Sequence, residues 1–250
     1  MNALILAAGY ATRLYPLTLN KAKPLLVVGG KPIIEWVADN LRDVPGLETI
    51  YVVTNDKFVA DFEAWTRDYQ RRHPNAKFKV VNDGSKSDAD KLGAIGDIHF
   101  VVAREKLDHD SILIIAGDNL FTEPLTRFVE SARGTEATVA VYDVGDLEAI
   151  KKYGNVTINA EGIITRFEEK PQNPQGTLAA IALYYYSPSV LSLLKSYLEA
   201  GNNPDQPGRF VQWLYTRVPV KTFQITGKWL DIGSRETLEK ADETLGALKT

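Results

Sequence analysis

The first residues whose types could bind a ligand or support catalysis lie in a turn close to the amino terminus. The segment Ala8–Arg13 (AGYATR) follows a short apolar run, and Lys23 stands before Pro24 further along the chain. Small residues allow backbone N–H groups to approach an anion closely, and the Arg13 guanidinium is a permanently charged, planar fork that suits phosphate oxygens. Together these groups could bind a polyphosphate. Taken alone, they also describe an ordinary strand-to-helix turn with two solvated cations.

Two aspartates follow short apolar runs. Asp118 comes after Ser111–Ala116 and Gly117, and Asp231 comes after Trp229-Leu230. A carboxylate at the carboxyl end of a strand is well placed to bind Mg²⁺, which takes one or two protein carboxylates and completes its shell with phosphate oxygens and water. Each aspartate could instead cap a turn, which is a common role for Asp. Both carboxylates could bind one ion if the two runs end side by side.

A third charged segment is Phe167–Pro171 (FEEKP). A residue before proline favours an extended backbone, so the sequence predicts an extended conformation at Lys170. From there the Lys170 ammonium could bind a monophosphate. A solvated charged strand end is the alternative, and Lys170 taken singly favours it.

Several function classes are excluded by what the sequence lacks. It contains neither G-x-x-x-x-G-K-[ST] nor G-x-G-x-x-G, which excludes a P-loop ATPase and a common dinucleotide-binding protein. It has no cysteine, which excludes disulfides, zinc–thiolate sites and cysteine nucleophiles. The loop Asp83–Asp90 is not a calcium loop, because Asp88 and Ala94 stand where a glycine and a bidentate glutamate are required.

Charge and hydropathy predict a protein that binds neither nucleic acid nor membrane. The 29 basic and 32 acidic residues give a formal charge of −3, with a pI of about 5.7. The apolar run Ala3–Ala8 is too short for a signal peptide, and no basic residue precedes it. No segment reaches the ~18 apolar residues of a membrane span. A cytoplasmic location is therefore expected.

In the first half of the chain, strand-like runs alternate with segments of helical spacing. The expected strands are Ala3–Ala7, Thr49–Thr54, Lys77–Val81 and Ser111–Ala116. The expected helices are Ile33–Leu41, Lys57–Arg72 and Leu92–Glu105. Such alternation is typical of βαβ units and a mainly parallel sheet.

The second half is richer in strands. They are expected at Thr138–Val144, Gly154–Ile158, Ile163–Glu168, Ala179–Tyr186, Val220–Gln224 and Trp229–Ile232, with a hairpin turn at Asn159–Gly162. Helices are expected after Pro188, around Phe210–Tyr215 and after the capping residue Ser234.

These elements predict the α/β class. The expected architecture is a Rossmann-like, three-layer α/β/α fold with a mixed, mainly parallel central sheet and a β-rich second half. The sequence shows no linker or repeat, so one domain is expected over residues 1–250, with two halves at 1–135 and 136–250. Ligands of such sheets bind beyond the carboxyl ends of the strands.

The assignment of these halves comes from a resemblance. LILAAGYATRLYPLT…KAKPLL, LIIAGDNLF, YGNV, FEEKP and WLDIGS occur in this order over nearly the whole chain. In order and spacing they resemble the sugar-1-phosphate nucleotidylyltransferases, and most of all the short glucose-1-phosphate thymidylyl- or uridylyltransferases.

The resemblance implies that residues 1–135 form a nucleotide-binding half and that residues 136–250 form a sugar-binding half with the last helix. It also implies roles for the charged residues above. Arg13 and Lys23 would bind the triphosphate, and Asp118 and Asp231 would bind Mg²⁺; with Lys170, these are the implied catalytic residues. Other residues implied to contact the nucleotide are Ala8, Gly9, Thr12, Asn82, Asp83 and Gly93. The residues implied to contact the sugar or its phosphate are Tyr153, Gly154, Glu169 and Lys170.

The chain departs from the family pattern at a few positions. The family commonly has Gly-Gly-x-Gly-Thr-Arg in the first turn, whereas alanines stand here at Ala8 and Ala11. If either position requires a positive φ, alanine costs conformational energy. Ala182 replaces a common glycine in the tyrosine-rich strand, and Asp83–Asp90 differs from the usual base-reading segment.

The implied reaction transfers a nucleotidyl group from an NTP to a sugar 1-phosphate. A sugar phosphate oxygen attacks the α-phosphorus and pyrophosphate leaves, with dTTP or UTP and glucose 1-phosphate as the favoured substrates. Catalysis then depends on positioning and charge stabilisation. The attacking phosphate is already ionised, so the reaction needs no general base. This agrees with the position of the three histidines, which all lie outside the motifs. The oligomeric state stays open.

Other functions remain possible at this point. A related enzyme could use phosphocholine or an inositol phosphate as the acceptor; Tyr184–Tyr186 could form part of an aromatic cage for the former. A glycosyltransferase of related fold would carry Asp-x-Asp where this chain has Asp118-Asn-Leu. A nucleotide sensor without catalysis is the third alternative, although it would be expected to have lost a metal-binding aspartate or a phosphate-binding cation.

Overall fold

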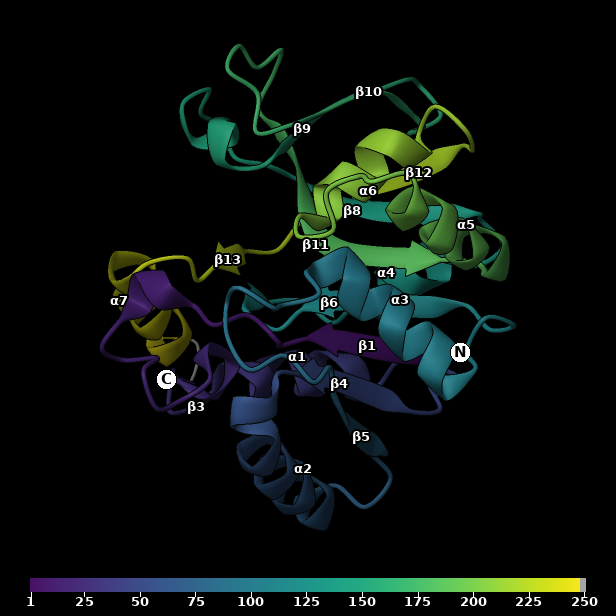
Figure 1. Ribbon diagram of the computed structural model, residues 1–250. Helices are drawn as coiled ribbons and strands as arrows, with labels where there is room; N and C mark the ends of the chain where they lie inside the picture. The colour runs from purple at the N-terminus through teal and green to yellow at the C-terminus, as the bar shows by residue number, and fades with distance from the viewer. Residues whose placement is uncertain (248–250) are drawn as a thin grey trace. The chain divides into compact units, whose positions relative to one another are not determined.

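The alternating segments at the start of the chain form parallel strands in the computed structural model, which describes residues 1–247 (Figure 1). β1 (Asn2–Leu6) pairs in parallel with β4 (Ile50–Thr54), which pairs in parallel with β5 (Phe78–Asn82). β4 is buried along its whole length, and β1 is buried at all but its last residue. This burial explains why both strands are continuous apolar runs.

Two amphipathic helices connect these strands. α1 (Ile33–Arg42) precedes β4, and α2 (Val59–Arg72) follows a 3₁₀ turn at Asp56–Phe58. α2 buries Phe62, Trp65 and Tyr69, and it contacts both β4 and β5, as Figure 1 shows. The spacing of three or four residues between these aromatic side chains therefore marks the face of α2 that packs on the sheet.

The chain forms two compact units, each assembled from separate stretches of sequence. The stretches of the first, here called the β1 unit, are 2–91, 115–126 and 227–247. Those of the second, here called the β8 unit, are 92–114 and 127–226. β6 (Ile112–Ala116) runs from the β8 unit into the β1 unit. The units do not follow the division into residues 1–135 and 136–250, and the single domain stays a prediction.

The last stretch of the β1 unit returns to earlier parts of the same unit. β7 (Asn119–Phe121) pairs in antiparallel fashion with β13 (Trp229–Asp231). The final helix, α7 (Arg235–Gly246), begins after Ser234, whose hydroxyl accepts a bond from the Thr237 N–H in a capping box. The sequence predicted this cap. It did not predict β7 or the short hairpin of β2 (Val27–Val28) and β3 (Lys31–Pro32).

The β8 unit contains mostly antiparallel strands. The strands are β8 (Ala137–Asp143), β9 (Gly154–Ile158), β10 (Ile164–Glu169), β11 (Leu178–Tyr186) and β12 (Val220–Gln224). β10 and β8 each pair antiparallel with a neighbour, β9 and β11 respectively, whereas β12 runs parallel to β8. The hairpin between β9 and β10 turns as predicted, with Gly162 at φ +76°.

Proline or glycine lies at the start of three of the four helices described in the β8 unit. They are α3 (Ala94–Glu105), α4 (Thr126–Ala132, from the unit boundary), α5 (Pro188–Glu199) and α6 (Pro207–Leu214). Proline at the first position suits α5 and α6, because it lacks an N–H that would have no partner there. α3 begins two residues later than predicted, since Gly93 adopts φ +78° before it. The short helix α4 was not predicted.

Together these elements confirm the α/β class with a mixed sheet and a β-rich second half. Tyr184 and Tyr186 are buried in β11, as expected of strand core residues. Within residues 1–247, no helix has both the length and the apolar character that a membrane span requires.

Candidate active site

The turn after β1 is fixed by buried hydrogen bonds. The Ala7 N–H donates to the Val53 carbonyl at 2.9 Å, and the Asn55 amide donates to the Ala8 carbonyl at 2.8 Å. The chain then turns outward, so that Gly9 and Arg13 are exposed to solvent. No residue in the described chain pairs with the Arg13 guanidinium, which leaves it available for an anion.

Ala11 is the strained residue of this turn. Its φ of 48° and ψ of 42° are left-handed, a conformation that L-residues other than glycine rarely adopt. The Thr18 hydroxyl and the Leu14 N–H both donate to its carbonyl, at 2.8 and 2.9 Å, and thereby hold the turn. The energetic cost expected from alanine at this glycine position is therefore present at Ala11. Ala8 has no positive φ.

Lys23 and Asp118 form a direct ion pair. The Lys23 ammonium donates to Asp118 Oδ2 and to the Ile232 carbonyl, the latter at 2.8 Å. Their side chains are only 17% and 25% exposed, so solvent screens the pair less than it would at the surface. Asp118 follows β6 through Gly117, where a Cβ would lie 2.9 Å from the Leu6 carbonyl oxygen. Glycine thus permits the close passage that places Asp118 beside Lys23.

Asp231 lies next to the same group because β13 pairs with β7. Asp231 is the register partner of Asn119, and the Ile232 N–H donates to the Asp118 carbonyl at 3.2 Å. Asn119 was missed as a site residue by sequence reasoning. Its amide donates to Asp118 Oδ1 at 3.0 Å, and its carbonyl accepts from Trp229 Nε1 at 2.7 Å. Its position directly after Asp118 was the available signal.

The donor chemistry of this group fits Mg²⁺. Asp118 and Asp231 provide carboxylate oxygens on adjoining segments, and Mg²⁺ is held by one or two protein carboxylates together with phosphate oxygens. The part of the chain that the structure describes holds no cluster of three or more His, Cys, Asp or Glu suited to a metal. The donor set is thus too small for a metal bound by protein alone, but sufficient for one shared with a polyphosphate.

Asn82 and Asp83 belong to a loop closed by local hydrogen bonds. Asn82 donates from its amide to Asp56 Oδ1, and its carbonyl accepts from the Gly84 N–H, both at 2.8 Å. The buried Asp83 carboxylate accepts from the Ser85 N–H at 2.7 Å and from the Ser85 hydroxyl. Both side chains therefore shape the loop that follows β5. Their contact with a base stays a prediction.

The predicted sugar-binding residues gather at one end of the β9–β10 pair. Glu169 is the register partner of Gly154, and the Lys170 N–H donates to the Tyr153 carbonyl at 3.0 Å. Gln212 of α6 accepts from the Glu169 N–H at 3.1 Å, a contact that sequence reasoning missed because 43 residues separate the two. The structure thus brings Tyr153, Gly154, Glu169 and Lys170 together within the β8 unit.

Glu169 has an unusual carboxylate. It is half-buried, yet no group within residues 1–247 donates a hydrogen bond to its oxygens. Burial raises the pKa of the Glu169 carboxyl, and the Lys170 and Arg209 cations oppose this rise. A desolvated acceptor without a donor is expected to bind a ligand hydroxyl well.

The backbone of Lys170 corrects one prediction. Lys170 has φ +51°, which is left-handed rather than the extended conformation predicted for a residue before proline. The bond from its N–H to the Tyr153 carbonyl ties Lys170 to the start of β9 while the chain leaves β10. This tertiary contact outweighs the local preference. Its side chain is exposed, as expected of a cation that could meet a phosphate.

Gly93 lies in the β8 unit at the start of α3. A Cβ there would lie 2.7 Å from the Pro204 carbonyl oxygen, and the Ile95 N–H donates to this carbonyl at 2.7 Å. Glycine at position 93 is thus explained by its positive φ and by this close passage. Its predicted contact with the nucleotide stays a prediction.

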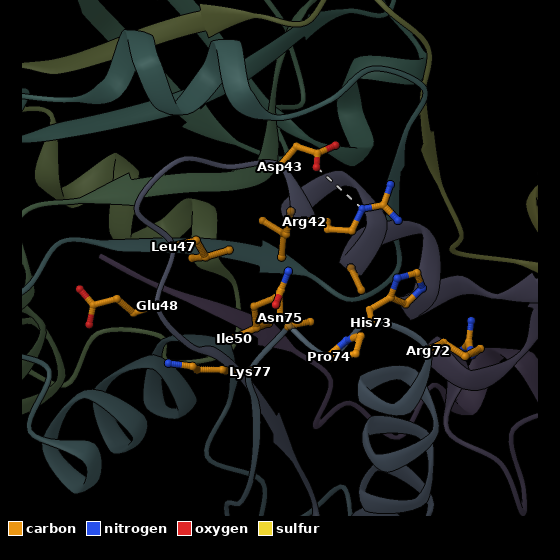
Figure 2. Close-up of a pocket in the computed structure, with 13 residues that line it drawn as sticks. Arg42, Asp43, Leu47, Glu48, Ile50, Arg72, His73, Pro74, Asn75 and Lys77 are labelled. Carbon is orange, nitrogen blue, oxygen red and sulfur yellow. Dashed lines mark ion pairs between the residues drawn. The ribbon is translucent and has the colours of Figure 1, made fainter.

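A cavity of about 370 Å³ in the β1 unit is lined by none of the predicted site residues (Figure 2). Its lining includes Arg42, Asp43, Arg72, His73 and Lys77, which follow or end α1 and α2 or precede β5. These segments flank the amino ends of β4 and β5, whereas the predicted site follows the carboxyl ends of the strands.

The chain belongs to the nucleotidyl transferase family, whose model matches residues 2–247. The resemblance to sugar-1-phosphate nucleotidylyltransferases is thereby confirmed, since curated relatives of the chain carry such names.

Two relatives show the extent of the similarity. The bifunctional protein GlmU of Methanocaldococcus jannaschii is 27% identical over 245 residues, which cover 98% of this chain and 54% of the relative. The glucose-1-phosphate thymidylyltransferase of Neisseria meningitidis serogroup A is 28% identical over 250 residues, covering 96% of this chain and 81% of the relative. The chain thus spans about half the length of the first.

A solved structure has the same fold. A UDP-glucose pyrophosphorylase complexed with UDP-glucose superposes with a TM-score of 0.82 at 22% identity, and the match covers 100% of this chain and 99% of that one. The predicted α/β fold of a nucleotidyltransferase is confirmed by this similarity.

Proposed function

We propose that this protein transfers a nucleotidyl group from a nucleoside triphosphate to a sugar 1-phosphate, with Mg²⁺ as cofactor. The observation that carries the proposal is the ion pair of Lys23 with Asp118 beside Asp231. This group combines a fixed cation with two carboxylates in a chain of the nucleotidyl transferase family. Positioned charges of this kind stabilise the transition states of phosphate transfer.

In the proposed reaction, an oxygen of the sugar phosphate attacks the α-phosphorus of the NTP. The bond from the α-phosphorus to the bridging oxygen breaks, and pyrophosphate leaves with the bonding electrons. Arg13 binds the β- and γ-phosphates through its guanidinium, which pairs with no other residue in the range 1–247. Lys23 holds Asp118 in place while its charge stabilises the leaving pyrophosphate. Asp118 and Asp231 would hold Mg²⁺, whose charge would offset negative charge on the phosphate oxygens.

The acceptor is assigned to residues of the β8 unit. Glu169 accepts hydrogen bonds from sugar hydroxyls, since its carboxylate has no donor among residues 1–247. The exposed Lys170 ammonium binds the acceptor phosphate, and Tyr153 with Gly154 forms the neighbouring wall. The acceptor phosphate is ionised near neutral pH, so no side chain is required as a general base.

The favoured substrates are dTTP or UTP and glucose 1-phosphate. This choice is supported by the name of the Neisseria relative and by the UDP-glucose pyrophosphorylase structure, although GlmU shows that substrates vary among relatives. Because such triphosphates are found in the cytoplasm, we propose that location for the enzyme.

Pyrophosphate release across a substrate grid tests the proposal. One axis is dTTP, UTP, CTP, ATP and GTP with Mg²⁺; the other is glucose, mannose, galactose and N-acetylglucosamine 1-phosphates, with phosphocholine added. Release that depends on one triphosphate and one sugar 1-phosphate, and is lost in Asp118→Ala, supports the proposal. Release with phosphocholine alone, or nucleotide binding without release in any combination, contradicts it.

A further inference from the structure

Gly208, the second residue of α6, lies directly against the Glu169 carboxylate. A Cβ built on Gly208 would lie 1.9 Å from Glu169 Oε2 and 2.8 Å from Cδ. Non-bonded carbon and oxygen atoms do not approach this closely, so even alanine at position 208 must displace the carboxylate. The missing side chain at Gly208 thus defines where the carboxylate of Glu169 can lie.

A second glycine also lies close to this carboxylate. A Cβ on Gly154 would lie 3.1 Å from the same Oε2 and 2.5 Å from Cζ of Phe167. Glu169 Oε2 therefore lies close to both Gly208 and Gly154, and the space that these residues leave by lacking a Cβ is here called the slot. Gln212 lies one turn after Gly208 on α6 and accepts the Glu169 N–H, so α6 fixes both ends of this residue.

The backbone offers no reason for glycine at position 208. α6 is helical from Pro207 to Leu214, and Gly208 is not among the residues with positive φ. In a helix, glycine is less favourable than alanine by up to about 1 kcal/mol. The glycine therefore costs helix stability, and the carboxylate that occupies the space of its Cβ is the feature that explains it.

We propose that Gly208 is a positioning residue for acceptor recognition, because the absence of its Cβ lets the Glu169 carboxylate occupy the position from which its oxygens meet the sugar hydroxyls. The inference rests on the proposed function and assigns part of its acceptor selectivity to α6. Since the carboxylate has no hydrogen-bond donor of its own in the described chain, its position depends on the shape of this slot. Lys170 and Arg209 are the cations whose charges act on it, and Tyr184 is the titratable hydroxyl near it.

The test is Gly208→Ala, which moves the carboxylate without removing its charge. The atom in conflict is the end of a flexible side chain, so the protein is expected to fold with a Tm equal to or above that of the wild type. The KM for the sugar 1-phosphate is expected to rise about tenfold or more, as for a displaced hydrogen bond to a charged group, while the KM for the NTP stays unchanged. Gly176→Ala, where a Cβ meets nothing within 4 Å, is the matched control in the same unit.

A double-mutant cycle separates positioning from a general disturbance of α6. In a Glu169→Ala background, Gly208→Ala is expected to leave the acceptor KM unchanged, because no carboxylate remains to be displaced. Glu169→Asp shortens the side chain by one methylene and is expected to recover part of the affinity lost in Gly208→Ala. Equal KM values for Gly208→Ala and wild type overturn the inference, and so does an equal rise of KM in both backgrounds.

The pH dependence of Tm, which requires no catalytic turnover, tests this inference separately from the proposed function. Glu169→Gln is expected to raise Tm more at about pH 8 than at about pH 5, since it removes a buried carboxylate. In Gly208→Ala, where the added Cβ displaces the carboxylate from the slot in which it is partly buried, this pH-dependent gain is expected to shrink. If no acceptor receives the nucleotidyl group, the proposed function is contradicted. If the pH-dependent Tm gain from Glu169→Gln is as large in Gly208→Ala as in the wild type, the role of the slot is contradicted.

Discussion

Asp118 and Glu169 are both carboxylates at strand ends, but they differ in whether protein groups donate hydrogen bonds to them. Asp118 in the β1 unit accepts from Lys23 on one oxygen and from Asn119 on the other. Glu169 in the β8 unit accepts from no group in residues 1–247, although it is half-buried. One carboxylate is thus compensated by the protein, and the other depends on a ligand for its hydrogen bonds.

This difference matches the ligand chemistry proposed for each unit. A polyphosphate and its metal bring strong charges, and a prearranged ion pair can stabilise them without reorganisation. A sugar hydroxyl is neutral and binds best to an acceptor that has not already been satisfied. The contrast predicts that substitutions in the β1 unit mainly lower the rate, whereas those in the β8 unit mainly weaken acceptor binding.

The largest expected effect comes from Asp118→Asn. It removes the partner of Lys23 and one of the two proposed metal ligands, so kcat is expected to fall on the order of 10²- to 10³-fold. Steady-state pyrophosphate release measures this change. Asp43→Asn is the matched control, because Asp43 is 73% exposed at the cavity of Figure 2. A Glu169 variant that lowered kcat as strongly would remove the contrast between the units.

Arg13→Ala is expected to come next. The guanidinium is exposed and pairs with no residue of the described chain, so its loss should leave Tm unchanged while kcat/KM for the NTP falls about 10²-fold. Arg71→Ala, which alters an exposed arginine of α2, serves as the control for charge. Near-wild-type kcat/KM in Arg13→Ala would contradict the role of this turn in binding phosphate.

Glu169→Gln is expected to raise the acceptor KM about tenfold with a small change in kcat. Its pH dependence sharpens the contrast further. Because burial raises the pKa of Glu169, the stability associated with this group is fully present below the unfolded-state pKa and is lost as pH rises through the folded-state pKa. The Tm gain of the variant over wild type should therefore grow with pH across this window. A constant Tm difference from about pH 4 to pH 8 would argue against a desolvated carboxylate.

The smallest effect is expected from the two alanines of the first turn. Ala11→Gly relieves a left-handed alanine and is expected to increase the free energy of unfolding by about 1 kcal/mol. Ala8→Gly, at a buried position without positive φ, is expected to lower it by about 0.5 kcal/mol or more. Urea denaturation of the two variants measures both changes. If both substitutions change the free energy of unfolding in the same direction, φ at Ala11 is not the source of strain.

Local chemistry was sufficient to predict several features of the fold. Ser234 caps α7 because its hydroxyl reaches an N–H three residues away, and Asn159–Gly162 turns because Gly162 accepts a positive φ. Long periodic segments such as α2 were also predictable, whereas α4 and β7 are too short to produce a pattern.

The features that could not be predicted depend on contacts between distant segments. Lys170 is left-handed because of its bond to Tyr153, against the preference imposed by the next proline. The slot around Glu169 requires Gly208, which lies on a helix 39 residues later in the chain (208 − 169). The residue types at the candidate site were readable from the sequence, but the two different environments of Asp118 and Glu169 were not.

The most direct test of nucleotidyl transfer is a ³¹P NMR time course with UTP or dTTP, glucose 1-phosphate and Mg²⁺. The expected result is equal growth of the diphosphate signals of a nucleotide sugar and of pyrophosphate as both substrates disappear, with no growth in Asp118→Asn. Formation of nucleoside monophosphate and pyrophosphate without a nucleotide sugar would contradict transfer to the sugar, and unchanged spectra with every triphosphate and sugar 1-phosphate would contradict the reaction altogether.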